Sequence, residues 1–96
     1  MKKRMIVVTT DSTRRGVFFG QLVSYDADKQ YAILKDAQMA IYWSAETKGV
    51  LGLASIGPQS GSRISPIISK IELNGVTSIM DCSDKAVEQW QKKIWD

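Results

Sequence analysis

The chain has 96 residues, 44% of them apolar, and a net charge of +3 from 13 Lys and Arg against 10 Asp and Glu. This length fits one compact domain and is too short for two. The mild charge excludes a strongly acidic DNA mimic and permits an anionic partner. No apolar run approaches the roughly 18 residues of a membrane span, so we expect a cytoplasmic protein without a membrane partner.

The sequence has no histidine and a single cysteine, Cys82. Without histidine, Ser-His-Asp and Cys-His catalytic sites and most zinc sites are excluded. Asp81 precedes Cys82, and a neighbouring carboxylate raises the pKa of a thiol instead of activating it. We therefore expect a binding protein with no catalytic residue, no metal and no cofactor, although a carboxylate-based enzyme stays open.

The first part of the chain predicts antiparallel strands. Residues 4–10 (RMIVVTT) are rich in β-branched side chains and end at a turn signal. Residues 17–25 (VFFGQLVSY) form a second strand, in which Gly20 indicates a bulge or sharp bend. A polar turn at residues 26–29 then leads to a third strand, residues 30–36, which completes a β-hairpin with the second.

Residues 37–43 (AQMAIYW) alternate in the manner of a fourth strand. The alternation places Trp43 on one face with Ala37, Met39 and Ile41, and Tyr42 on the other. We expect Trp43 in the core and Tyr42 outward, although the pattern leaves open which ring is exposed.

Ser44 is expected to cap a short helix that runs through about Ala54, with Gly57-Pro58 ending it. Gly49 and Gly52 lie inside this helix at a cost of about 1 kcal/mol each relative to alanine. We infer that their missing side chains let another backbone or a ligand come close.

The last part predicts a hairpin and a helix. Residues 66–73 and 76–80 flank Asn74-Gly75, a strong signal for a type I′ turn. Ser83 or Asp81 then caps a C-terminal helix over residues 83–95, with Val87, Trp90 and Ile94 on one stripe. The whole is expected to be a single, mostly β domain: a small SH3-like, partly open antiparallel barrel of about six strands over residues 4–80, with one short internal helix and the terminal helix.

The loop IGPQSGSRIS at residues 56–65 could bind an anion. Glycines and serines can present several N–H and hydroxyl donors, and an arginine adds a planar fork for phosphate. The loop lacks the lysine and spacing of a P-loop, and it could equally be a plain connector. The candidate ligand-binding residues are Ser60, Ser62 and Arg63 from the loop, with Arg14, Arg15, Tyr42 and Trp43.

The segments VFFGQLVS, LKDA, AIYWS and GVLGLASIG, followed by a terminal hairpin and Cys-Ser, resemble a family of short phage- and prophage-encoded domains of unknown function. The resemblance spans roughly residues 16–83 and assigns no residue roles. A phage origin would imply a counter-defence factor, similar in chemistry to oligomeric "sponge" proteins that sequester a nucleotide immune signal.

Three functions are consistent with the sequence. The first is a homo-oligomeric binder that holds a cyclic oligonucleotide or a cyclic ADP-ribose-like signal in pockets between subunits, in the host bacterial cytoplasm. The second is an SH3-like or OB-like nucleic-acid-binding module, which a charge of only +3 disfavours. The third is a direct protein-protein inhibitor of a host protein.

Overall fold

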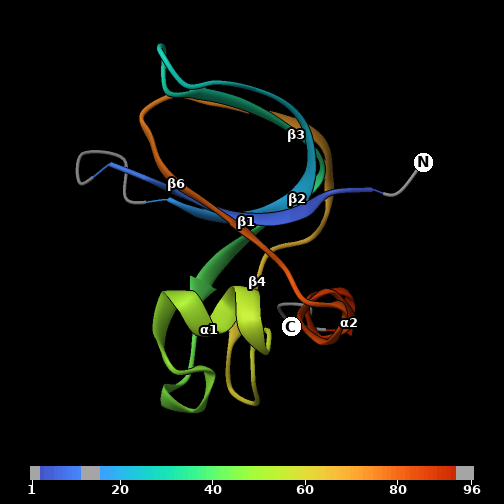
Figure 1. Ribbon diagram of the computed structural model, residues 1–96. Helices are drawn as coiled ribbons and strands as arrows, with labels where there is room; N and C mark the ends of the chain where they lie inside the picture. Colours follow the sequence, from blue (N-terminus) through green and yellow to red (C-terminus); the bar gives the residue numbers. More distant parts are fainter. Residues whose placement is uncertain (1–2, 12–15, 93–96) are drawn as a thin grey trace.

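The computed structural model describes residues 3–11 and 16–92, which form one mostly β domain with two short helices (Figure 1). The elements follow in the order β1 (Met5–Thr10), β2 (Val17–Asp26), β3 (Tyr31–Tyr42), a 3₁₀ turn (Ala45–Thr47), α1 (Gly49–Ser55), β4 (Arg63–Ile64), β5 (Ile68–Leu73), β6 (Val76–Asp81) and α2 (Asp84–Lys92).

The six strands form one antiparallel sheet, in which five follow the order β4-β3-β2-β1-β6 and β5 pairs with β3 off this path. Strand β5 pairs with the first part of β3, whereas β4 pairs with its end. The sheet curls strongly in Figure 1, but among the described residues no pairing between β5 and β6 closes it into a barrel. The expected mostly β, six-stranded antiparallel fold with helical additions is confirmed.

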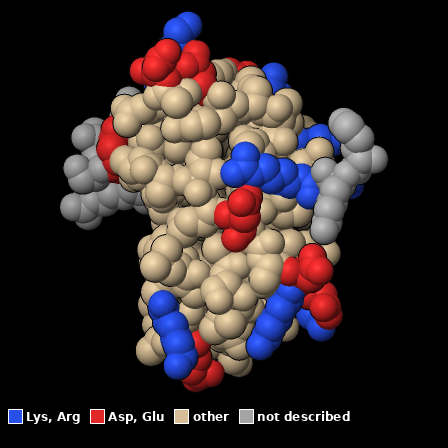
Figure 2. All heavy atoms as spheres, in the orientation of Figure 1, with Lys and Arg blue, Asp and Glu red and all other residues tan. Residues whose placement is uncertain are grey.

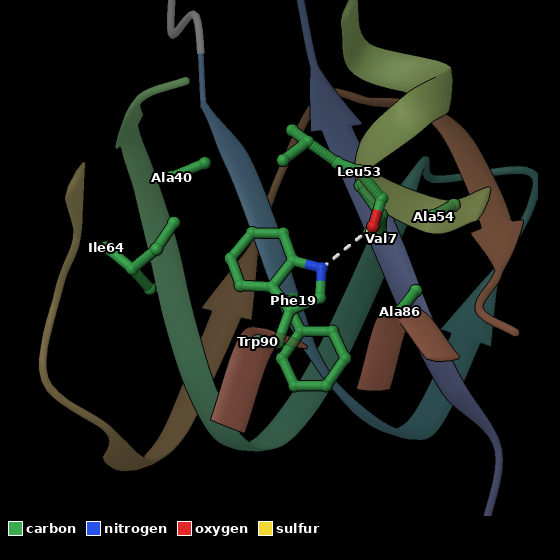
Figure 3. Packing of buried hydrophobic residues seen from close by; sticks show 8 residues of the cluster. All are labelled: Val7, Phe19, Ala40, Leu53, Ala54, Ile64, Ala86 and Trp90. Atoms are coloured by element: carbon green, nitrogen blue, oxygen red, sulfur yellow. Dashed lines mark hydrogen bonds between the residues drawn. The ribbon is translucent and has the colours of Figure 1, made fainter. Parts of the chain in front are cut away.

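Two hydrophobic clusters occupy the two faces of the sheet. The helix-side core lies between the sheet and the helices and consists of Val7, Phe19, Ala40, Leu53, Ala54, Ile64, Ala86 and Trp90 (Figure 3). The inner core lies on the opposite face and consists of Ile6, Val8, Ala32, Leu34, Ala37, Leu73 and Val76. Strand β1 supplies both cores because successive side chains of a strand point to opposite faces, and its three central residues are fully buried.

Trp90 anchors α2 to the helix-side core. Its ring stacks on Phe19 with centroids 4.8 Å apart, and its indole Nε1 donates a hydrogen bond to the Leu53 carbonyl over 2.9 Å (Figure 3). Ser83 donates hydrogen bonds to the two carbonyls that follow Leu53 in α1. Its N–H bonds the Ala54 carbonyl, and its hydroxyl bonds the Ser55 carbonyl. Since the last carbonyls of a helix have no partner within it, the start of α2 satisfies the end of α1.

The start of α2 agrees with the sequence. The Ser83 Oγ accepts a hydrogen bond from the Ala86 N–H over 3.0 Å, so Ser83 is the predicted N-cap. Val87 and Trp90 lie on the side that packs on the core. Ile94 and the end of the predicted helix lie outside the described residues.

Three of the predicted secondary-structure elements are wrong. The third and fourth predicted strands are one strand, β3, with Asp36 at a positive φ of 51° where the break was expected. Residues 68–73 and 76–81 form no hairpin: β5 pairs with β3, and β6 pairs with β1 on the far side of the sheet. The Asn74-Gly75 turn therefore passes the chain from one edge of the curled sheet to the other.

The helix predicted from Ser44 is also wrong, because it is broken into a 3₁₀ turn and α1. Lys48 and Gly49 both have positive φ, 66° and 81°, which interrupts the helical path. No side-chain hydrogen bond from Ser44 caps the turn. The inference about Gly52 is confirmed, since a Cβ there would lie 1.6 Å from the Thr47 carbonyl oxygen. The same inference about Gly49 is wrong, because a Cβ there would meet no atom of the described residues within 4 Å, and this glycine instead serves a positive φ.

Candidate functional site

An exposed ring and a guanidinium group lie side by side where β3 meets β4. Tyr42 and Arg63 are register partners in this antiparallel pair, so their side chains leave the same face of the sheet. With Ile41 and Gly61 they line an open hollow of about 340 Å³, here called the Tyr42 hollow. The Tyr42 side chain is exposed, at 56% of its maximum, and its ring is free to stack.

The Arg63 guanidinium is available to an anion. It is exposed, and within residues 3–11 and 16–92 it forms no ion pair. On the face drawn in Figure 2, charges of both signs are scattered over a mostly uncharged surface. Among the described residues that line the Tyr42 hollow, Arg63 alone is charged, so an anion there would meet a single arginine.

The serine-glycine loop is held in shape by hydrogen bonds to Ser44 and Thr47, at the 3₁₀ turn before α1. The Ser62 Oγ accepts a hydrogen bond from the Ser44 N–H over 3.2 Å and lies 3.4 Å from the Thr47 hydroxyl. The Thr47 Oγ1 in turn accepts a hydrogen bond from the Gln59 N–H over 3.0 Å. Gly61 follows at a φ of 90°, a conformation that favours glycine. Ser62 therefore positions the loop, and Gly61 and Arg63 reach the hollow.

The remaining predicted site residues fall in different places. Ser60 is exposed on the turn before Gly61 but is not among the residues that line the Tyr42 hollow. Trp43 is half-buried against the helix-side core. Arg14 and Arg15 lie outside the described residues. The structure thus brings together Tyr42, Arg63 and the loop backbone.

The structure resolves which of the two aromatic rings is exposed. Tyr42 is exposed and Trp43 packs on the core, but the predicted faces are wrong, since Trp43 packs with Ala40 and Ala37 belongs to the opposite core. The register of β3 shifts between Ala40 and Tyr42, and this irregularity breaks the strict alternation.

A second hollow, which the sequence reasoning missed, lies on the helix side of the sheet next to α2. Its volume is about 340 Å³, and we call it the Gln38 hollow. Its lining residues are Lys3, Met5, Phe19, Gln21, Asp36, Gln38, Ile67, Val87 and Gln91. The available signal was a glutamine inside the apolar segment AQMAIYW, which simple alternation placed outward.

Gln38 is an unusual residue for a core, with only 4% of its surface exposed. Its Nε2 donates a long hydrogen bond of 3.4 Å to the Ser65 carbonyl. Its Oε1 is buried and has no hydrogen-bond partner among the described residues. A buried acceptor with no partner at all would cost about 1–3 kcal/mol, so we expect this oxygen to bind a water molecule or a ligand group in the hollow.

Cys82 has the character expected of an inert thiol. Burial, with a smaller contribution from the Asp81 carboxylate, raises the pKa of Cys82 to about 12. The thiol is therefore protonated at neutral pH and is a poor nucleophile. In the part of the chain that the structure describes, no three His, Cys, Asp or Glu side chains gather as metal ligands, and no helix is long and apolar enough to cross a membrane.

The fold and the two hollows define a small, curled antiparallel β domain with two helices packed on one face, and with an aromatic-arginine pair at the end of its longest strand. The chain belongs to the family described as Domain of unknown function (DUF6948), whose model matches residues 2–90. The expectation of a family of unknown function is thus confirmed, whereas the phage origin and the sponge-like chemistry stay predictions. The comparison with curated proteins found no match.

Proposed function

We propose that this protein is a non-enzymatic binder of a small phosphorylated nucleotide, held at the Tyr42 hollow. Tyr42 stacks on the base, and Arg63 contacts a phosphate. The observation that supports this most is the register pairing of an exposed ring with an arginine free of ion pairs among the described residues. Stacking of a base on an aromatic ring contributes about 1–3 kcal/mol, and arginine matches phosphate with two parallel donors.

The open shape of the hollow favours a pocket shared between copies of the chain. A ligand on Tyr42 and Arg63 alone would keep one side in water, and Ile41 beside them is 42% exposed. A second copy that covers this apolar surface would enclose the ligand and complete its contacts. Arg14, Arg15 and Ser60 remain proposed contributors of donors, and Trp43 supports the strand end from the core side.

The ligand class that suits one ring and one phosphate contact per chain is a cyclic oligonucleotide or a cyclic ADP-ribose-like molecule. The resemblance to phage-encoded domains supports a counter-defence role, in which the protein sequesters such a signal in the bacterial cytoplasm without changing it. Within the described residues the inert Cys82 supports the same non-catalytic interpretation.

The proposal is tested by mass spectrometry of captured ligands. The purified protein is incubated with cyclic dinucleotides, cyclic trinucleotides and cyclic ADP-ribose isomers, then desalted and denatured. We expect one compound to be released unchanged, and to be lost with Arg63→Ala but retained with Arg4→Ala, an exposed arginine that pairs with Asp81. Release of no compound, or of a chemically altered one, would refute the proposal.

A nucleic-acid-binding module would behave differently when the same purified protein is titrated with oligonucleotides. Its affinity would increase with oligonucleotide length and fall steeply with salt, because each phosphate contact releases counterions. A single small ligand engages few phosphates and should show weak salt dependence. Binding that strengthens with oligonucleotide length would therefore favour the nucleic-acid function over the proposed one.

A further inference from the structure

We infer that the Gln38 hollow is a separate binding site, for the neutral planar edge of a carboxamide or nucleobase. It does not depend on the proposed function, since none of the residues that line it lines the Tyr42 hollow. Its volume of about 340 Å³ falls at the lower end of the range for small-molecule sites.

The hydrogen-bonding capacity of Gln38 selects the ligand chemistry. A glutamine amide has two N–H donors and one carbonyl acceptor. One donor of Gln38 bonds the Ser65 carbonyl, and this contact also fixes the orientation of the amide because two carbonyl oxygens would repel. An unpaired acceptor, Oε1, and one remaining donor are left. An amide or the edge of adenine offers the complementary donor and acceptor, as in glutamine-adenine pairs.

The walls of the hollow suit a flat, uncharged group. Phe19 is held by its stacking on Trp90 and is only 1% exposed, so it offers almost no surface to a ligand. The apolar surface of the hollow comes from Met5, Ile67 and Val87. The charged residues at this hollow, Lys3 and Asp36, are of opposite sign and both exposed, which gives no net preference for an ion. Most contact is therefore apolar, with Gln38 as the buried polar group that sets orientation.

The proposal explains why a glutamine occupies this buried position. An apolar residue of similar length would avoid an unpaired oxygen, so the native amide lowers the stability of the empty protein. Replacing Gln38 by Met should then leave the stability unchanged or raise it, while abolishing the hydrogen bonds to a ligand. A purely structural glutamine would show the opposite change in stability.

The experiment is an NMR titration of the full chain with nicotinamide and adenine, with N,N-dimethylnicotinamide as a matched probe that lacks N–H donors. We expect saturable chemical-shift changes of the Gln38 side-chain amide and of Val87 with at least one of nicotinamide and adenine. Binding should be weaker by about tenfold or more for the dimethyl probe and for Gln38→Met. Tyr42→Ala should leave these shifts unchanged, so failure here is distinct from failure of the proposed function.

Three results would overturn the inference: no saturable shift with nicotinamide or adenine, equal affinity of nicotinamide and its dimethyl analogue, or undiminished binding to Gln38→Met. The first would mean that water alone serves the unpaired oxygen. If Gln38→Met does not fold, the comparison of the two nicotinamides on the native chain still decides the question.

Discussion

Replacing Trp90 by Phe tests how the helices are held to the sheet. Trp90 is fully buried, and its indole N–H is the partner of the Leu53 carbonyl at the end of α1. The change leaves that carbonyl unpaired, at about 1–3 kcal/mol, and removes part of a ring stacked on Phe19. Including the lost packing, we expect a loss of about 2–4 kcal/mol of unfolding free energy.

The assay is urea unfolding followed by far-ultraviolet circular dichroism. In thermal unfolding, the same loss of stability corresponds to a fall in Tm of roughly 10–25 °C for a domain of this size. Lys85→Ala, an exposed change on the same helix, is the control and should stay within about 0.5 kcal/mol of the native chain. If Trp90→Phe also stayed within that limit, the proposed anchoring of α2 through the end of α1 would be refuted.

Two further predictions concern the backbone and the thiol. Gly52→Ala forces a Cβ against the Thr47 carbonyl and should lower the unfolding free energy by more than about 3 kcal/mol. Gly49→Ala places its Cβ in open space, and its positive φ alone should cost about 1 kcal/mol. Urea unfolding of both variants measures these losses, and equal losses would contradict the prediction. Because burial raises the pKa of Cys82 from 9.0 to about 12, the unfolded thiol ionises first and stability should fall as pH rises between these values. Iodoacetamide should accordingly label native Cys82 at pH 8 far more slowly than the urea-unfolded chain, and comparable rates would count against a protonated, shielded thiol.

The local elements that depend on nearby residues could be predicted from the sequence. The β2–β3 hairpin follows from a polar turn in which the Asp26 carboxylate accepts hydrogen bonds from the N–H groups of Asp28 and Lys29. Gly20 lies at a register shift between β2 and β3, as a strand glycine indicates. The Ser83 cap has the usual local signature of a helix start.

The features that depend on distant pairing could not be predicted in the same way. Asn74-Gly75 favours a tight turn, but the sequence does not say whether the flanking strands pair with each other or with β3 and β1. Tertiary pairing determined the outcome there. The break between the 3₁₀ turn and α1 lies at the positive φ angles of Lys48 and Gly49, and a lysine in this conformation is not a signal that the sequence provides.

The candidate site also has a part that the sequence predicted and a part that it did not. The strand end and the loop meet where Tyr42 pairs with Arg63, but the sequence could not predict this register because 20 residues separate the two positions. Gln38 was missed because alternation assumes a regular strand, and β3 has a positive φ at Asp36 and a register shift near its end. A buried polar residue inside an apolar strand is the signal that points to the second hollow.

The central claim, that Tyr42 and Arg63 together receive one nucleotide, is tested most directly by calorimetric titration of variants with the compound found by mass spectrometry. Tyr42→Ala should weaken binding about 5- to 150-fold through lost stacking. Tyr25→Ala, which removes another exposed tyrosine at 43% exposure, should leave the affinity unchanged. Equal affinities for the native chain and Tyr42→Ala would contradict the account.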